Sequence, residues 1–159
     1  MTNRTILALF ATALAFSASA GAPSDAGKAL QHATGSFDVK TQPIVADKSA
    51  AISNMSLEKE YHGDLEAKGK GAMLATGSAK GNGAYVALEV VTGKLKGREG
   101  SFVLQHTGIA TQGTPPQLNI TVVPNSGTGQ LRTLSGKLTI VVADGKHSYD
   151  LEYTLADGS

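Results

Sequence analysis

Two residues of a central hairpin, Glu89 and His106, are the ones whose type and placement are best suited to chemistry. In a strand with period two, Glu89 shares a face with Tyr85 and aliphatic residues, and His106 shares one with Phe102 and Leu104. A carboxylate and an imidazole in an apolar cavity have perturbed pKa values and could act as acid and base, or fix the polar end of a ligand. The alternative is a structural pair, or two separate residues each hydrogen-bonded to backbone. The sequence alone does not show that both face the same side.

Tyrosine hydroxyls are the other polar groups that could reach the same interior. Tyr61 and Tyr153 lie in segments where apolar and polar residues alternate, so their hydroxyls could reach the interior. The candidate ligand-binding residues are Glu89, His106, Tyr85 and Tyr61. No catalytic residue can be assigned. The chain has no GxSxG elbow, no GxGxxG before a helix and no GK[ST] motif.

Metal binding has one weak candidate. The four histidines form no HxH or HExxH motif. His62, Asp64 and Glu66 fall on one strand face at period two and could present three ligands, but a solvated polar face explains them more simply. We expect neither a metal nor a cofactor.

The hairpin that carries Glu89 and His106 is the strongest strand signal in the chain. Residues 84–92 form its first strand, and because both faces are largely apolar, we expect this strand to be buried on both sides. The glycine-bounded segment 93–100 is predicted to be the turn, and residues 101–108 the second strand.

The remaining segments also favour strands. Glycines follow one another too closely for a long helix, and Asp144-Gly145 is typical of a hairpin turn. About eight strands at hairpin spacing, without a βαβ crossover, predict an all-β antiparallel barrel or sandwich. The other predicted strands cover residues 32–40, 55–62, 64–76, 118–123, 137–143 and 147–155.

The first twenty residues are predicted to be a secretory signal peptide. Arg4 precedes an apolar run, residues 5–16, and Ala18-Ser19-Ala20 is a small-x-small cleavage site. The run is too short for a membrane span, which needs roughly 20 apolar residues, so we expect no stable membrane anchor. Residues 21–31 are predicted to be a flexible lead-in and residues 32–159 a single domain. We expect a periplasmic or secreted protein, cleaved after Ala20.

The charge and the cysteine content limit the classes of partner and of chemistry that fit this chain. Loss of Arg4 leaves 13 of the 14 basic residues against 13 acidic ones, so the domain is nearly neutral. A neutral domain without charge blocks argues against nucleic acid as a partner. The absence of cysteine excludes disulfides and thiolate chemistry.

Several segments resemble the DUF3224 family of bacterial proteins. The central block is GAYVALEVVTGKLKGREGSFVLQHTG, and the others are ATGSFDVK, EYHGDLEAKGKGAML, VPNSGTGQLRTLSGKL and HSYDLEYTL. The resemblance covers residues 32–155. It implies a closed antiparallel β-barrel similar to allene oxide cyclase and distantly to the calycins. It implies no activity, because the family is named for its unknown function.

Three functions remain open at this stage. The first is a barrel that binds a small apolar molecule in its lumen. The second is a cyclase or isomerase resembling allene oxide cyclase, which rests on the analogy of fold alone. The third is a structural protein without turnover that associates with itself as a homo-oligomer.

Overall fold

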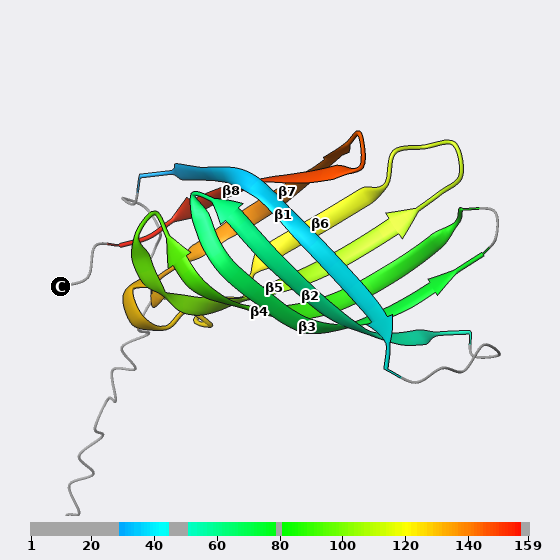
Figure 1. Ribbon diagram of the computed structural model, residues 1–159, viewed down its shortest axis with the longest axis horizontal. Helices are drawn as coiled ribbons and strands as arrows, with labels where there is room; N and C mark the ends of the chain where they lie inside the picture. The colour runs from blue at the N-terminus through cyan, green and yellow to red at the C-terminus, as the bar shows by residue number, and fades with distance from the viewer. Residues whose placement is uncertain (1–28, 45–50, 79–80, 157–159) are drawn as a thin grey trace, which may run out of the picture.

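The computed structural model describes residues 29–44, 51–78 and 81–156, which form one closed antiparallel β-barrel of eight strands (Figure 1). The predicted signal peptide and most of the predicted lead-in lie outside the described residues. The strands are β1 (Gln31–Pro43), β2 (Ser53–Gly63), β3 (Leu65–Gly77), β4 (Gly83–Leu95), β5 (Arg98–Ala110), β6 (Gln117–Val122), β7 (Ser135–Ala143) and β8 (Lys146–Thr154).

The topology is the simplest one that closes a sheet. Each strand pairs with the next in the sequence, and β1 pairs with β8. The predicted closed antiparallel barrel is therefore confirmed. No helix among the described residues is long and apolar enough to cross a membrane.

Two of the hairpins, β4–β5 and β7–β8, are closed by two-residue turns that set their register. Between β4 and β5 the turn is confined to Lys96-Gly97, because Gly93 and Gly100 already pair within the ladder. The predicted turn over residues 93–100 was therefore too long. Lys96 and Gly97 have φ values of 45° and 81°, which fit a hairpin turn matching the right-handed twist of the strands. The predicted turn at Asp144-Gly145 is confirmed, with φ values of 51° and 72°.

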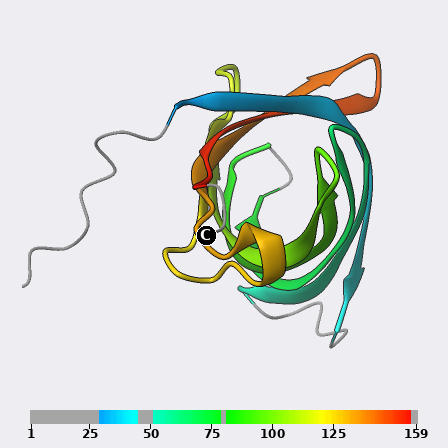
Figure 2. The ribbon, with the colours of Figure 1, turned by 90° about the vertical axis from the view of Figure 1, so that its left-hand side faces the viewer.

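One end of the barrel is closed, and we call it the closed end. The loop after β6 carries the 3₁₀ turn η1 (Gly129–Leu131), which packs Leu131 and Leu134 into the core; Figure 2 views the barrel from this side. The loop is held to β5, where Thr128 N donates to Ser101 O at 2.8 Å. Inward side chains from most strands fill this half: Ala33, Phe37, Tyr61, Leu65, Val91, Leu95, Phe102, Leu104, Val122, Leu138, Tyr149, Leu151 and Tyr153.

The opposite end, the open end, is less filled. It is bordered by the β3–β4 and β7–β8 hairpins and by the β5–β6 loop (Figure 1). Leu118 and Val142 have inward positions in β6 and β7, yet both are exposed here. Among the described residues, the inward side chains therefore leave the lumen more accessible at this end.

The outer face of β4 differs from the prediction. Val86, Leu88 and Val90 point outward and are 50–58% exposed, so β4 is not buried on both sides. The physical reason is that the barrel wall is a single sheet, and none of the described residues forms a second layer over it.

Tyr149 ties β8 to the β2–β3 turn, and its loss is expected to weaken the fold. Its hydroxyl accepts from Leu65 N at 2.9 Å and donates to His62 O at 3.2 Å. Tyr149→Phe leaves the buried Leu65 N–H without an acceptor, so the free energy of unfolding in urea should fall by about 1–3 kcal/mol. Tyr153→Phe is the control, because its hydroxyl donates to the partly exposed Gln31 side chain. Equal losses in the two variants would contradict this assignment.

Candidate functional site

Three charged or polar side chains from three strands meet inside the barrel. Lys59 from β2, Glu89 from β4 and His106 from β5 are all buried. Glu89 Oε2 lies 2.9 Å from Lys59 Nζ and 3.0 Å from His106 Nε2. We call these three residues the polar cluster.

The β4–β5 register explains why Glu89 and His106 meet. Glu89 pairs with Leu104, and His106 pairs with Ala87, so the two are diagonal neighbours on the inner face. The structure thus places both on the same side, which the sequence left open.

Tyr61 is the fourth polar residue of this region. Its hydroxyl donates to Glu89 Oε1 at 2.9 Å and accepts from Lys59 Nζ at 3.2 Å. Lys59 Nζ also lies 4.8 Å from the centroid of the Phe37 ring, within the range of a cation–π contact. The Tyr61 hydroxyl therefore stabilises both the Lys59 ammonium and the Glu89 carboxylate by hydrogen bonds.

Two buried atoms of the polar cluster have no well-aligned hydrogen bond. Glu89 Oε2 and His106 Nε2 are close to charged neighbours, but neither meets the angles of a hydrogen bond among the described residues. Such atoms carry unused hydrogen-bonding capacity in a low-dielectric interior.

The surroundings shift the pKa values of the cluster in defined directions. Burial would raise the pKa of Glu89, but its contacts with His106 and Lys59 outweigh burial and lower the pKa. Burial lowers the pKa of Lys59, more than Glu89 raises it. Burial and the Glu89 charge raise the pKa of Tyr61 far above its usual range. At neutral pH Glu89 is therefore ionised and Tyr61 keeps its proton.

Two glycines that the sequence did not single out make room for this arrangement. A Cβ atom at Gly69 on β3 would overlap Glu89 Oε1, and one at Gly108 on β5 would overlap the Tyr85 ring. Both glycines lie within regular strands, where the sequence suggests only a bend or bulge. Their role is visible only once the strand pairs are known.

An apolar cavity of about 260 Å³ opens at the open end. Its lining includes Met73, Ala75, Tyr85, Gly108 and Leu118. The pKa of Tyr85 is raised by burial and by the charge of Glu89, which lies on the same inner face of β4. Tyr85 thus lies between the cavity and the polar cluster.

Lys59 is the site residue that the sequence analysis did not select. It alternates with Leu57 and Tyr61, both of which point inward. That alternation was a usable signal, because a lysine on an otherwise apolar strand face needs an anionic partner.

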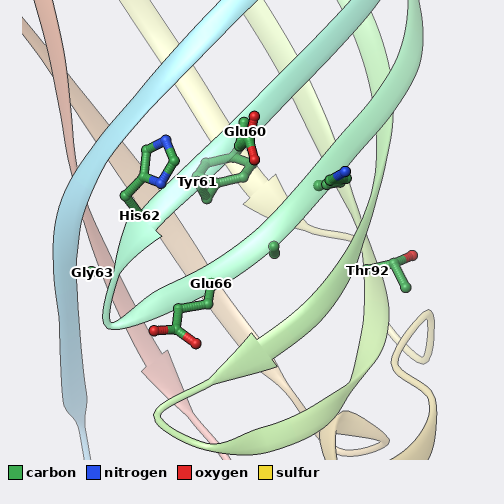
Figure 3. A pocket seen from close by; sticks show the side chains of 8 residues that line it. Glu60, Tyr61, His62, Gly63, Glu66 and Thr92 are labelled. Carbon is green, nitrogen blue, oxygen red and sulfur yellow. The ribbon is translucent and has the colours of Figure 1, made fainter.

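The three residues weighed as metal ligands, His62, Asp64 and Glu66, do not share one strand face. His62 and Glu66 lie on neighbouring strands and border an outer hollow of about 560 Å³ (Figure 3), while Asp64 lies in the turn between them. His62 Nε2 lies 3.3 Å from Asp38 Oδ2, and Asp64 is paired with Lys96 at 3.7 Å. No group of three metal-ligating side chains occurs in the part of the chain that the structure describes.

Comparison with known proteins identifies the family. The family model described as "Protein of unknown function (DUF3224)" matches residues 33–153. The chain belongs to the DUF3224 family. A crystal structure of a DUF3224 protein of unknown function from Shewanella oneidensis MR-1 is 41% identical, with a TM-score of 0.75. The match covers 82% of this chain and 100% of that chain. No curated protein matches the chain.

The ion pair between Lys59 and Glu89 can be tested by a double-mutant cycle. Glu89→Gln leaves the Lys59 ammonium buried without its carboxylate, so the free energy of unfolding should fall by about 3–5 kcal/mol. Lys59→Met combined with Glu89→Gln should lose clearly less than the sum of the single losses, because the two side chains are in contact.

Urea unfolding measures all three variants. Glu58→Gln on the outer face of β2 is the control and should stay within about 0.5 kcal/mol of the unmodified protein. Strictly additive losses would show that Lys59 and Glu89 do not stabilise one another.

Proposed function

We propose that this DUF3224 protein binds a small, largely apolar molecule in the open end of its barrel, with a polar end directed toward the polar cluster. The observation that carries the proposal is that Glu89 and His106 lie on the same inner strand faces as Tyr85 and Gly108, which line the apolar cavity. Tyr85 belongs to the cavity lining and carries the raised pKa that the Glu89 charge helps to cause.

Energetics support a role for the cluster beyond stability. A buried ion pair is commonly no more stable than well-packed apolar residues of the same volume. The polar cluster also leaves Glu89 Oε2 and His106 Nε2 without aligned hydrogen bonds. A hydroxyl or carbonyl group on a ligand supplies the partner that these atoms lack.

The cavity limits the size of the ligand. Its volume of about 260 Å³ exceeds the roughly 150 Å³ that suffices for benzene in an apolar cavity. It is smaller than the roughly 300–1,000 Å³ of sites for drug-sized molecules. A single substituted ring or a short chain fits these limits.

Binding can be tested with 4-ethylphenol and ethylbenzene, which differ only in the hydroxyl group. The methyl signal of Met73, followed by NMR in protein labelled at the methionine methyl groups, should shift on titration with either probe. The phenol should bind more tightly. In the variant combining Lys59→Met and Glu89→Gln, this preference should shrink by at least about threefold, because the hydroxyl loses its charged partners.

A matched pair of variants tests the location. Ala75→Phe places a ring in the cavity and should weaken binding at least about tenfold, whereas Ala72→Phe on the outer face of β3 should not. An unmoved Met73 signal with both probes at millimolar concentration would reject the cavity as a binding site for such molecules.

A second candidate is an isomerase or cyclase, and one observation favours it. An ionised Glu89 lies beside His106 and accepts from the Tyr61 hydroxyl, so a base and a hydroxyl donor lie together in the barrel interior.

Proton transfer can be measured with cyclohexanone in D₂O. The protein should accelerate the exchange of its α-hydrogens for deuterium, and Glu89→Gln should remove the acceleration, while Glu58→Gln should retain it. Exchange at the rate of buffer alone would reject this candidate for carbonyl substrates and leave the binding proposal intact.

A further inference from the structure

Large aliphatic side chains gather on one outer face of the barrel, over β3, β4 and β5. Each is about half exposed or more. Five of them occupy outward strand positions, opposite to the inward residues of the same strands, and Ile52 lies in the bend just before β2. We call the group the apolar face, and it consists of Ile52, Leu74, Val86, Leu88, Val90 and Ile109.

The strand pairing makes the apolar face continuous. Leu74 pairs with Val86, and Ile109 pairs with Ala84 beside it. Leu88 pairs with Ala72 on one side and Gln105 on the other, so only small or uncharged side chains separate the larger ones. The face therefore crosses three strands without a charged residue at its centre.

The apolar face is large for a monomer. Six half-exposed aliphatic side chains present on the order of 500 Å², near the top of the roughly 300–600 Å² that the largest patch of a soluble monomer spans. With the small and uncharged side chains that lie between its members, it approaches the roughly 800 Å² that each partner contributes to a standard protein interface.

The shape of the face suits a copy of itself. Beside the ridge of Val86, Leu88 and Val90 lies a shallow hollow of about 380 Å³, whose lining includes Ile52, Leu74 and Ile109. A two-fold axis through such a surface places the ridge of each copy against the hollow of the other. Two twisted sheets can pack face to face in this way with their strands about 30° apart.

The composition favours a second copy over other partners. An isologous interface brings the same patch of both copies together, and residues near its two-fold axis meet their own equivalents, so an uncharged centre avoids like-charge contacts. The nearest charge on β3 is Lys70, which pairs with Val90 at the edge of the face. A membrane surface would instead favour aromatic residues and a cluster of basic residues around the patch, whereas the six residues include no aromatic side chain and Lys70 is a single basic residue at the β3 edge.

We infer that the apolar face is the interface of a symmetric homodimer of this protein. Homodimer interfaces are the more apolar class of protein contacts, which agrees with a face of valine, leucine and isoleucine. This inference does not depend on the proposed ligand, because the outward and inward residues of β4 are different side chains.

Sedimentation of the purified protein over a range of concentrations tests the inference. The unmodified protein should sediment as a dimer, and Leu88→Lys should raise the dimer dissociation constant at least about tenfold, because each interface then buries two charges. Val141→Lys is the matched control. Val141 is 55% exposed on the outer face of β7, against 58% for Leu88, and this change should leave the dimer intact.

Cross-linking gives a second readout in a chain that has no cysteine of its own. Leu88→Cys should form a covalent dimer with a short bismaleimide, and Val141→Cys should not. Three results would overturn the inference: a monomer up to about 0.5 mM, an assembly that Leu88→Lys leaves unchanged, or equal cross-linking at both positions.

Discussion

The interior of a closed eight-stranded barrel is only wide enough for side chains or one small ligand, and this limit governs the whole molecule. Each large side chain that points inward takes up space that its neighbours in the lumen cannot also fill. At the closed end, rings and leucines fill the lumen and η1 packs Leu131 beneath them. Toward the open end, Gly69 and Gly108 give up side-chain volume to Glu89 and Tyr85. The site has room for Glu89 and Tyr85 because these two glycines have no side chains.

The same limit makes the polar cluster a mutually dependent unit. Lys59, Glu89 and His106 are too buried to be solvated, so the Lys59 ammonium and the Glu89 carboxylate depend on one another, and all three side chains depend on their neighbours for polar contacts. Tyr61 contacts both charges, and Phe37 lies against the ammonium group. Removal of Lys59 or Glu89 alone leaves the other charge buried without its partner, which lowers the free energy of unfolding. Removal of both avoids this loss. The charged side chains in the lumen therefore act together as one hydrogen-bonded and ion-paired group.

The sequence predicted the strands well because alternation is a local property. It also placed Glu89 and His106 each on a definite face of its strand. It could not say that these faces coincide, because that depends on the register, and the turn was predicted over residues 93–100 instead of Lys96-Gly97. Lys59 was passed over for a related reason: a lysine within an alternating strand is usually solvated, and only the closed barrel reveals that its face is the lumen.

The error on the outer face of β4 has a physical basis as well. A strand that is apolar on both sides normally lies between two layers. This barrel has a single layer, so Val86, Leu88 and Val90 remain outside while Ala87, Glu89 and Val91 lie inside. One strand thus carries the anion of the candidate site and the centre of the proposed interface on alternate residues. Because the wall is a single layer, the outer side chains of β4 are left for a partner to cover, while its inner side chains build the candidate site.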